Sequence, residues 1–486
     1  MTPPDVLSQL GLTDYNQLTE LLEQLDVRAA GNNTRQAYYD MHNMFQDLGI
    51  AVPPQLRTLE VAMGWPAKAV DLLSRRVRLD SYVLPDGDVA DWGIPQIMTD
   101  NRMETEAPQA TVTTLTNSPA FIMTTVGNTS LGEPELLLSF YDATQATGIW
   151  EPARRGLRAW LGVRERNDFG EPTSLLYLTP TLGWGITKQA NGRWDCEPAP
   201  THGLGRVPVE PLVYRANLRR PFGSSRINRA VMAITNSAMR TVVRSEVGAE
   251  FYSSPQRYLL GADESMFVGP DGVQKHAWDL VTGRILAVPG ADEDGAPPPS
   301  LGQFPQVSMQ PHTDHLRMWA TLFAGETSIP VSSLGVVQDN PASAEAIYAA
   351  KEDLVIEAEG VCEGFTPAYI RAMQTGVQMR DRLAVLPDEL RGLGLRWRDP
   401  STPSRAAATD AVMKQVQAGV LPADSDVALE QLGYDDTTIR RIQADRRRAS
   451  GSAALRAITD AIAPTAPPVG PPVTPAAAAD VPPDAA

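Results

Sequence analysis

The order of hydrophobic and polar residues changes along the chain from a helical period to a strand period and back. Over residues 5–80 apolar residues recur every three or four positions, as in LTDYNQLTELLEQL, which predicts amphipathic helices. From about 111 to 200 the apolar runs are short and rich in β-branched and aromatic residues. Turn sequences such as NDFGEP and ANGRW separate these runs. We therefore expect an antiparallel sheet packed against the N-terminal helices, an α+β unit.

The expected strands are read directly from these runs. They are TVTTL, AFIMTTV, ELLLSFY, GLRAWLGVRE, TSLLYLT and GWGITKQ, the first of which begins at Thr111.

The helical period returns after residue 223. The pattern predicts a long helix at about 224–253, then about 55 turn-rich residues with strand candidates HAWDLV and RILAV. A second helix, HTDHLRMWATLFAGE, leads into a loop of small and polar residues. A third long helix begins near Ser343, and two more are expected at 404–418 and 424–449. From residue 464 the Pro/Ala-rich sequence carries too little apolar surface to order itself.

The first long helix has an unusual distribution of side chains. At about 100° per residue, its four arginines fall within roughly 60° of the helix circumference. They are Arg226, Arg229, Arg240 and Arg244. Apolar residues cover two other faces, whereas a surface helix of a monomer usually has one buried stripe. The arginines form either a solvated or ion-paired face, or a face turned to phosphates or to another subunit.

The third long helix carries an acidic stripe. Glu345, Glu352 and Glu359 repeat every seven residues, and apolar residues repeat at the same interval on the opposite side. Two interpretations stay open: a solvated acidic face, or an acidic face that lines a cavity shared between subunits.

Composition limits the function classes. The chain has 486 residues, enough for two to four domains, with 43% hydrophobic and 21% charged residues and a net charge of −16. A protein that wraps nucleic acid is normally basic, so contact with DNA is expected only through small basic patches. Two isolated cysteines favour a reducing compartment, and neither a signal peptide nor an apolar span is evident. These features predict a soluble, intracellular protein.

Catalytic motifs are missing from the sequence. Neither a P-loop nor the G-x-G-x-x-G, H-E-x-x-H and G-x-S-x-G patterns occur. His312 and His315 are three residues apart, but no further metal ligand is evident nearby, so we interpret them as polar residues of a helix start. No cofactor, metal site or catalytic residue is expected.

Four segments, taken in order, resemble the portal proteins of tailed bacteriophages, of the SPP1-like type found in siphophages of actinobacteria. LRTLEVAMGWPAKAVDLLSRRV at 56–77 resembles the segment before that family's wing sheet. Residues 208–261 are similar to its proline- and arginine-rich approach, Gly-Ser turn, stem helix and PQR-aromatic-LLG exit. SIPVSSLGVVQDNPASAEAI resembles the tunnel loop and helix start, and WRDPSTPSRAAATDAVMKQVQAGVLP resembles the segment that enters the crown.

The resemblance implies a division of the chain. The implied segments are N-terminal helices and a wing β-sheet at 1–222, a first stem helix at 223–254, a β-rich clip at 255–309, a second stem helix at 310–327, a tunnel loop and long helix at 328–376, wing closure and crown helices at 377–450, and a disordered tail at 451–486.

The resemblance also implies a function and partners. Portal proteins are rings, usually of twelve subunits, at one capsid vertex, and double-stranded DNA passes through them without sequence specificity during packaging and ejection. The implied partners are the large terminase, a head–tail adaptor and the major capsid protein or scaffold, with no membrane. The implied location is the virion, after assembly in the host cytoplasm.

Candidate channel residues follow from the same resemblance. They are the four arginines, Ser332, Ser333, Gln338 and Asn340 of the loop, and the three glutamates of the acidic stripe. An acidic lumen with few basic contacts lowers friction on sliding DNA, since each neutralised phosphate adds affinity. The alternatives are a head–tail adaptor ring, a class that is typically shorter, and a nuclease or peptidase of the phage head, for which no catalytic set is evident.

Overall fold

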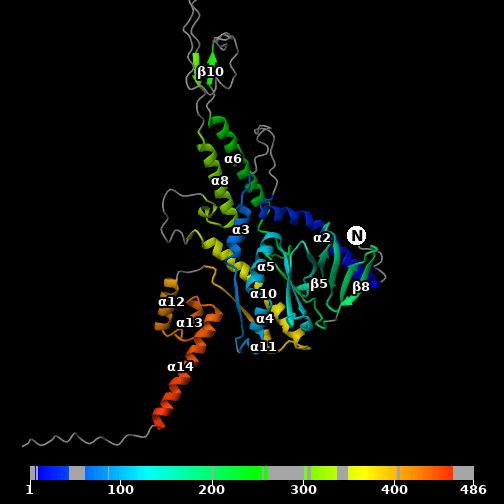
Figure 1. Ribbon diagram of the computed structural model, residues 1–486, viewed down its shortest axis with the longest axis vertical. Coiled ribbons are helices and arrows are strands. Elements are labelled where there is room, and N and C mark those ends of the chain that lie inside the picture. Colours follow the sequence, from blue (N-terminus) through cyan, green and yellow to red (C-terminus); the bar gives the residue numbers. More distant parts are fainter. Residues whose placement is uncertain are drawn as a thin grey trace, which may run out of the picture. The chain divides into compact units, whose positions relative to one another are not determined.

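The computed structural model describes residue 6 and residues 9–42, 61–85, 87–199, 202–253, 257–260, 300–303, 308–335, 349–401 and 405–462. The chain divides into two compact units, 1–402 and 403–486, each of which is described by itself. Figure 1 labels their helices and strands. Both helices and sheets build the first unit, so the α+β class expected from the sequence is confirmed.

Helices α2 (Leu12–Tyr39), α3 (Trp65–Ser74), α4 (Ile94–Asp100) and α5 (Met103–Asn117) precede most of the strands, and α10 (Glu352–Arg380) and α11 (Asp388–Arg391) follow them. The strands of this part are β1 (Leu79–Val83), β2 (Ala120–Val126), β3 (Leu136–Tyr141), β4 (Ala146–Glu151), β5 (Gly156–Arg166), β6 (Pro172–Leu178), β7 (Gly183–Lys188), β8 (Trp194–Ala199), β9 (Val209–Leu212) and β12 (Gly394–Trp397). Two short 3-10 helices, η2 (Thr129–Leu131) and η4 (Val331–Leu334), complete it.

Every ladder of these sheets is antiparallel. Five strands pair in the order β4-β5-β6-β7-β8, a meander in which each strand follows its neighbour in the sequence. Three others pair as β3-β2-β9, and β1 pairs with β12. Helix α2 lies along the five-stranded sheet, where Leu18, Leu21 and Leu25 pack on strand residues such as Leu161 and Tyr177.

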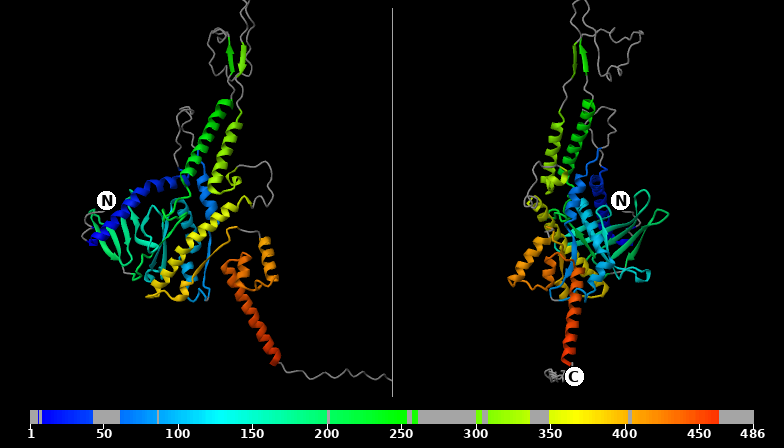
Figure 2. Two further views of the ribbon diagram at one scale, coloured as in Figure 1. Left: turned by 180° about the vertical axis from the view of Figure 1, so that it is seen from behind. Right: turned by 60° about the vertical axis from the view of Figure 1, so that its left-hand side comes forward.

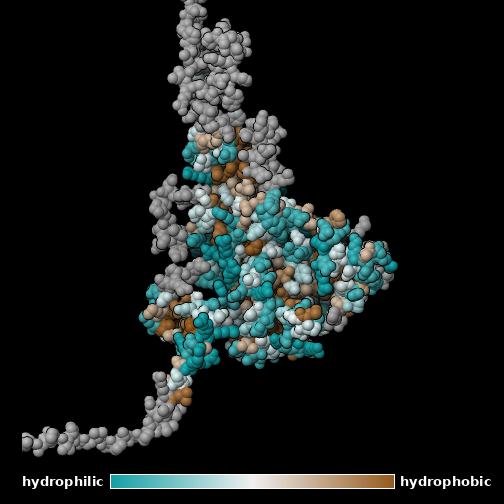
Figure 3. All heavy atoms as spheres, viewed as in Figure 1, coloured by the Kyte–Doolittle hydropathy of each residue, from teal (hydrophilic) through white to brown (hydrophobic). Residues whose placement is uncertain are grey.

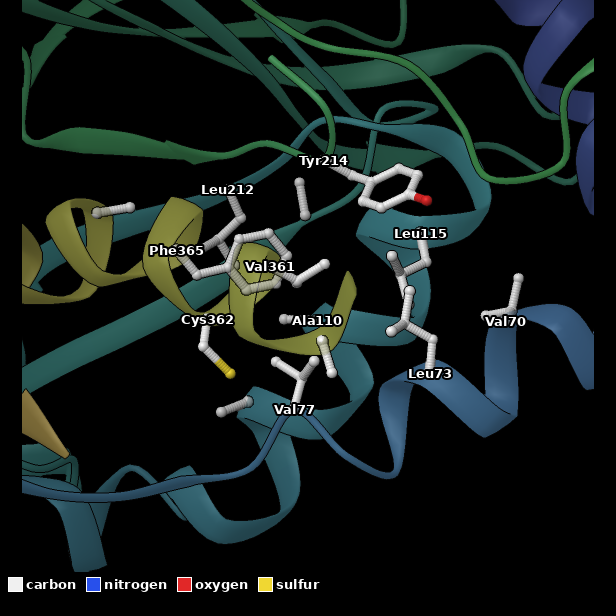
Figure 4. Packing of buried hydrophobic residues seen from close by; sticks show 14 of the residues in the cluster. Val70, Leu73, Val77, Ala110, Leu115, Leu212, Tyr214, Val361, Cys362 and Phe365 are labelled. Carbon is white, nitrogen blue, oxygen red and sulfur yellow. The ribbon is translucent and has the colours of Figure 1, made fainter. Parts of the chain in front are cut away.

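The main core lies between α3, α5, α10 and the three-stranded sheet. Figure 4 shows Leu73, Leu115 and Phe365, from three different helices, turned toward one another beside Leu212. Helix α10 approaches β3 closely because Gly376 has no side chain; a Cβ at this position would lie 2.3 Å from Leu136 Cδ2. This core fixes the platform from which the next two helices extend.

The segment TVTTL is helical, not a strand, so this expectation was wrong. It lies inside α5, and three threonine hydroxyls of this helix donate hydrogen bonds of 2.7–2.9 Å to the carbonyls four residues earlier. The donors are Thr111, Thr114 and Thr116. These bonds satisfy the hydroxyls inside the helix, and burial of the same face outweighs the β-preference of threonine.

Two long helices lie side by side, as both views of Figure 2 show: α6 (Arg229–Ser253) and α8 (Gln310–Thr327). Helix α6 begins five residues later than the expected 224. Asn228 is its N-cap, since its Oδ1 accepts a hydrogen bond of 2.9 Å from the Val231 amide. Between the two helices, β10 (Arg257–Leu260) pairs with β11 (Ser300–Gln303). The strand candidates HAWDLV and RILAV lie outside the described residues.

The third long helix is interrupted, contrary to expectation. Its expected start at Ser343 lies outside the described residues, but Ala350 and Lys351 form a turn and α10 begins at Glu352. Glu352 and Glu359 are therefore on α10, and the proposed seven-residue repeat does not run along one continuous helix.

The second unit is helical, with α12 (Arg405–Gln417), α13 (Asp426–Gln431) and α14 (Asp436–Ile462). The single helix expected at 424–449 is two helices, because Gly433 adopts a left-handed backbone (φ 83°) between them. The expected disorder from residue 451 is wrong for residues 451–462, which continue α14. Residues 463–486 lie outside the description.

Candidate functional site

The α6–α8 pair is held together and to the body by specific contacts. Asn228 Nδ2 donates a hydrogen bond of 2.7 Å to Glu326, and Phe323 of α8 packs against Trp65 of α3, with ring centroids 5.4 Å apart. Tyr38 of α2 donates a hydrogen bond of 2.8 Å to Asn236 of α6. The buried side of each helix thus packs against residues of the same chain. The opposite sides of the two helices are described next.

The outer side of α6 carries three of the four expected arginines. Arg229 and Arg244 are exposed and Arg240 is half-buried. Arg240 Nη2 donates a hydrogen bond of 2.9 Å to Ser237, one turn away. Across the described ranges, no carboxylate forms an ion pair with any of the three. This basic stripe, defined by Arg229, Arg240 and Arg244, is open to an external anion.

Arg226 does not belong to the stripe, so its expected role as a channel residue is corrected. It precedes the helix and is 3% exposed. Its Nε donates a hydrogen bond of 2.7 Å to the Ala69 carbonyl, and Nη2 donates one to the Thr327 carbonyl. A guanidinium enclosed in this way inside one subunit cannot reach DNA or a neighbour.

The partner of Arg226 is Glu357 of α10, a residue that sequence reasoning missed. Arg226 Nη1 lies 2.7 Å from Glu357 Oε2, and Arg215 Nη2 lies 2.6 Å from Oε1. Tyr214 donates a hydrogen bond to the same carboxylate. Burial alone would raise the pKa of Glu357, but Arg226 and these hydrogen bonds hold it below its ordinary value. The cluster joins α3, the end of α8 and α10.

The exposed side of α8 carries apolar residues among polar ones. Met318 and Leu322 are 43% and 49% exposed, and with Gly325 they span about 60° of the helix circumference. Figure 3 shows hydrophobic surface on this helix pair among hydrophilic surface. Ala320, Phe323 and Ala324 form the buried side of the same helix. We call Met318, Leu322 and Gly325 the apolar stripe of α8. Large apolar side chains that are left exposed on one helix face are candidates for contact with a further chain.

The loop and the acidic stripe are only partly described. Ser332 is exposed and Ser333 is half-buried, both in η4, and the Ser333 carbonyl accepts a hydrogen bond of 2.8 Å from Lys68. Glu352 and Glu359 are exposed on α10, opposite the buried Leu354 and Val361. Gln338, Asn340 and Glu345 lie outside the described residues.

Metal-ligand groups and thiols can be located within the described ranges. These ranges contain no group of three or more His, Cys, Asp or Glu side chains that could hold a metal ion. Cys196 and Cys362 are both free thiols. No described helix combines the length and the apolar run that crossing a bilayer requires.

Comparison with known proteins gives a consistent result. A family described as "Phage portal protein, SPP1 Gp6-like" matches residues 21–452. The portal protein of Mycobacterium phage D29 is 29% identical over 429 residues, 85% of each chain. That of Mycobacterium phage L5 is 30% identical over 411 residues, 82% of this chain and 81% of that one.

Solved structures with a similar chain come from gene transfer agent (GTA) particles. The neck of the empty GTA particle computed with C6 symmetry aligns with a TM-score of 0.45 at 12% identity, over 79% of this chain and 94% of the other. The neck of the native GTA particle computed with C12 symmetry aligns with a TM-score of 0.43 at 13% identity, over 82% and 98%.

The α6–α8 pair exposes basic side chains on one helix and apolar side chains on the other. The chain belongs to the SPP1 Gp6-like family of phage portal proteins, as the match over residues 21–452 establishes. It is a portal protein of a tailed phage, a component of virion particles. The membership of the portal family that four sequence segments predicted is therefore confirmed.

Proposed function

We propose that this portal protein assembles into a closed ring of twelve copies at one capsid vertex and that double-stranded DNA passes through its centre during packaging and ejection. The observation that carries the proposal is the α6–α8 pair, whose basic stripe and apolar stripe are both uncovered within one chain. In a ring each pair has a neighbour on two sides, so both stripes gain a surface to contact.

The parts of the chain take the roles that the family resemblance implies. Residues 1–222 form the wing, with α6 and α8 as the stem and 255–309 as the clip. Residues 328–376 form the tunnel loop and its helix, and the crown comes from the segment to 450. The clip docks the large terminase during packaging and the head–tail adaptor afterwards. The capsid protein or scaffold contacts the ring's outside, and assembly takes place in the host cytoplasm.

The channel is lined by weakly attractive and repulsive groups. Ser332, Ser333, Gln338 and Asn340 offer neutral hydrogen-bonding groups from the loop, and Glu345, Glu352 and Glu359 offer negative charge. Exposure of Ser332, Glu352 and Glu359 is compatible with this role. Because every neutralised phosphate adds affinity, a lining of this kind lets the duplex slide. Arg229, Arg240 and Arg244 contact either the neighbour's carboxylates or sparse phosphates.

The ring is tested by negative-stain electron microscopy together with native mass spectrometry of the purified protein and of virion necks. We expect particles with a central hole and a mass of twelve copies of the 52.6 kDa chain. A different copy number in virions would overturn the stoichiometry. A compact monomer at every concentration, with no ring in virions, would overturn the whole proposal.

A further inference from the structure

A polar pocket lies outside the α6–α8 stripes, and none of its lining residues belongs to them. It is an open pocket with a volume of about 670 Å³, within the range of ligand pockets, and it is lined by α2, the end of α5, β4 and residues 219–225. Four arginines line it: Arg28, Arg35, Arg219 and Arg220. Not one of its lining residues is an Asp or Glu. In a chain with 58 acidic and 42 basic residues, a cavity lined by four arginines and no carboxylate is a marked local reversal of charge.

The four guanidinium groups lack charge partners within the described ranges, where none forms an ion pair with a carboxylate. Partial burial lowers the pKa of Arg28 and of Arg35. Arg35 is half-buried and the other three arginines are exposed. Positive charges gathered around one pocket repel one another, and a bound anion relieves that repulsion.

The arginines are held in place. Arg35 Nη1 donates a hydrogen bond of 2.8 Å to Asn32 Oδ1, and Asn32, which is 2% exposed, donates one of 3.0 Å to the Ala143 carbonyl. The Arg28 guanidinium lies 5.7 Å from the ring centroid of Phe222.

A tight turn presents the other two arginines. Asn217 Oδ1 accepts hydrogen bonds from the backbone amides of both Arg219 and Arg220, at 3.0 and 2.9 Å. The turn is fixed through the backbone, so both side chains stay available to a ligand.

An independent observation also points to a missing ligand. Asn117 lines the cavity, is 2% exposed, and its Oδ1 accepts no hydrogen bond from the described part of the chain. The Asn117 Nδ2 donates to Gln36 Oε1, and the Gln36 Nε2 donates to Asp40, which fixes the orientation of both amides. The free acceptor suits a ligand that brings a hydroxyl group or a bound water together with its negative charge.

We propose that this cavity is a binding site for a phosphate group, carried either by free phosphate or by the DNA backbone. Guanidinium forks match the oxygens of phosphate in pairs. A phosphate also offers more acceptor oxygens than a carboxylate, so it suits a site with four arginines better.

The test uses the full-length protein and two probes, inorganic phosphate at constant ionic strength and a short fluorescent DNA duplex. The variant is Arg219→Gln/Arg220→Gln, whose exposed side chains make no contact needed for folding. The matched control is Arg154→Gln/Arg164→Gln, which removes two exposed arginines outside the cavity. Without ligand, the control should unfold at the temperature of the wild type, and the variant at that temperature or higher, because two of the crowded positive charges are gone.

If free phosphate is the ligand, it raises the unfolding midpoint of the wild type and the control but not that of the variant. If the DNA backbone is the ligand, phosphate has no effect and duplex affinity falls about tenfold or more in the variant alone, equivalent to about 1.4 kcal/mol. The proposal would be overturned if variant and control lost the same amount of binding. It would also be overturned if neither phosphate nor the duplex bound the wild type.

Discussion

Arg226 and Glu357 are 131 positions apart in the sequence and meet where α3, α8 and α10 converge. The ion pair is nearly enclosed, with side chains 2% and 12% exposed. In such a place the cost of removing one partner exceeds the benefit of having the pair, because the remaining charge stays buried.

Arg226→Met should therefore be strongly destabilising. We expect a loss of about 3–5 kcal/mol, since Glu357 loses its buried partner and two carbonyls lose a donor. Thermal unfolding followed by circular dichroism measures the effect. Arg229→Met, on the exposed stripe three residues away, is the control and should leave the midpoint nearly unchanged. Adding Glu357→Gln to Arg226→Met should recover part of the lost stability. Equal losses of stability in Arg226→Met and Arg229→Met would contradict this account.

Glu210 makes a second residue-level prediction, of pH dependence. It is 8% exposed on β9, and burial raises its pKa to about 7 although Arg371, 3.8 Å away, opposes the shift. Between the ordinary pKa near 4.5 and 7, the folded state binds more protons than the unfolded state, so the contribution of Glu210 to stability falls as pH rises through this window.

Glu210→Gln should remove this dependence. The variant and the wild type should unfold at similar temperatures at about pH 4.5, and the variant should be the more stable at pH 8, by up to roughly 3 kcal/mol. Unfolding midpoints across this pH range measure it. A difference that does not change with pH would show that Glu210 is ionised throughout.

Residue-level roles were the least accessible from the sequence. The periodicity placed Arg226 with the three exposed arginines because position on an ideal helix was the available criterion. Asn228, an N-cap residue, would have moved the helix start to Arg229 and separated Arg226 from the stripe. Nothing in the local sequence identifies Glu357 as its partner, because that contact depends on how three distant segments pack.

At the scale of elements, the helices with strong periodicity were predictable and the short strands less so. Strands β4 and β8 were not anticipated, since ATGIWE contains Gly148 and WDCEPA contains Pro198, both poor strand formers. Strand β4 pairs with β5, and β8 pairs with β7, so hydrogen bonds to these neighbours hold both segments extended. The strand predicted at TVTTL was wrong for the opposite reason. Its composition favours a strand, but its threonine hydroxyls form hydrogen bonds inside a helix.

The apolar stripe of α8 gives a prediction about assembly. Met318→Glu/Leu322→Glu should shift the protein from rings to monomers, because two charges would have to be buried against the neighbouring subunit. The fold of the single chain should be retained, since both side chains are exposed within it. Mass photometry measures the ring fraction at fixed protein concentration.

Thr313→Glu/Thr321→Glu is the control for added charge on exposed positions of α8 outside the stripe. If both double variants reduce the ring fraction equally, the stripe has no special role in assembly.

At the scale of the whole molecule, the order of the segments carried more information than any one of them. Four weak matches in the right sequence pointed to the portal family, and the family match over 21–452 confirmed it. The division into two compact units at residue 402 was not anticipated, although the Pro/Ser-rich run DPSTPS at 399–404 marks it.

That division predicts that the first unit folds without the second. A chain ending at Thr402 should unfold with the same midpoint for the first unit as the full-length protein, because its core is complete before that residue. Differential scanning calorimetry should show one transition lost and the other unchanged. A truncated chain that fails to fold would mean that α12–α14 complete the core.

The pairing of β10 with β11 has an evolutionary consequence. Leu260 and Ser300 face each other across the antiparallel ladder, so the 39 residues 261–299 leave and re-enter the molecule at one point. A segment with adjacent ends is exchangeable as a cassette: another lineage can substitute a longer or shorter insert without moving either long helix. Such a lineage can change this segment while keeping the rest of the chain as it is.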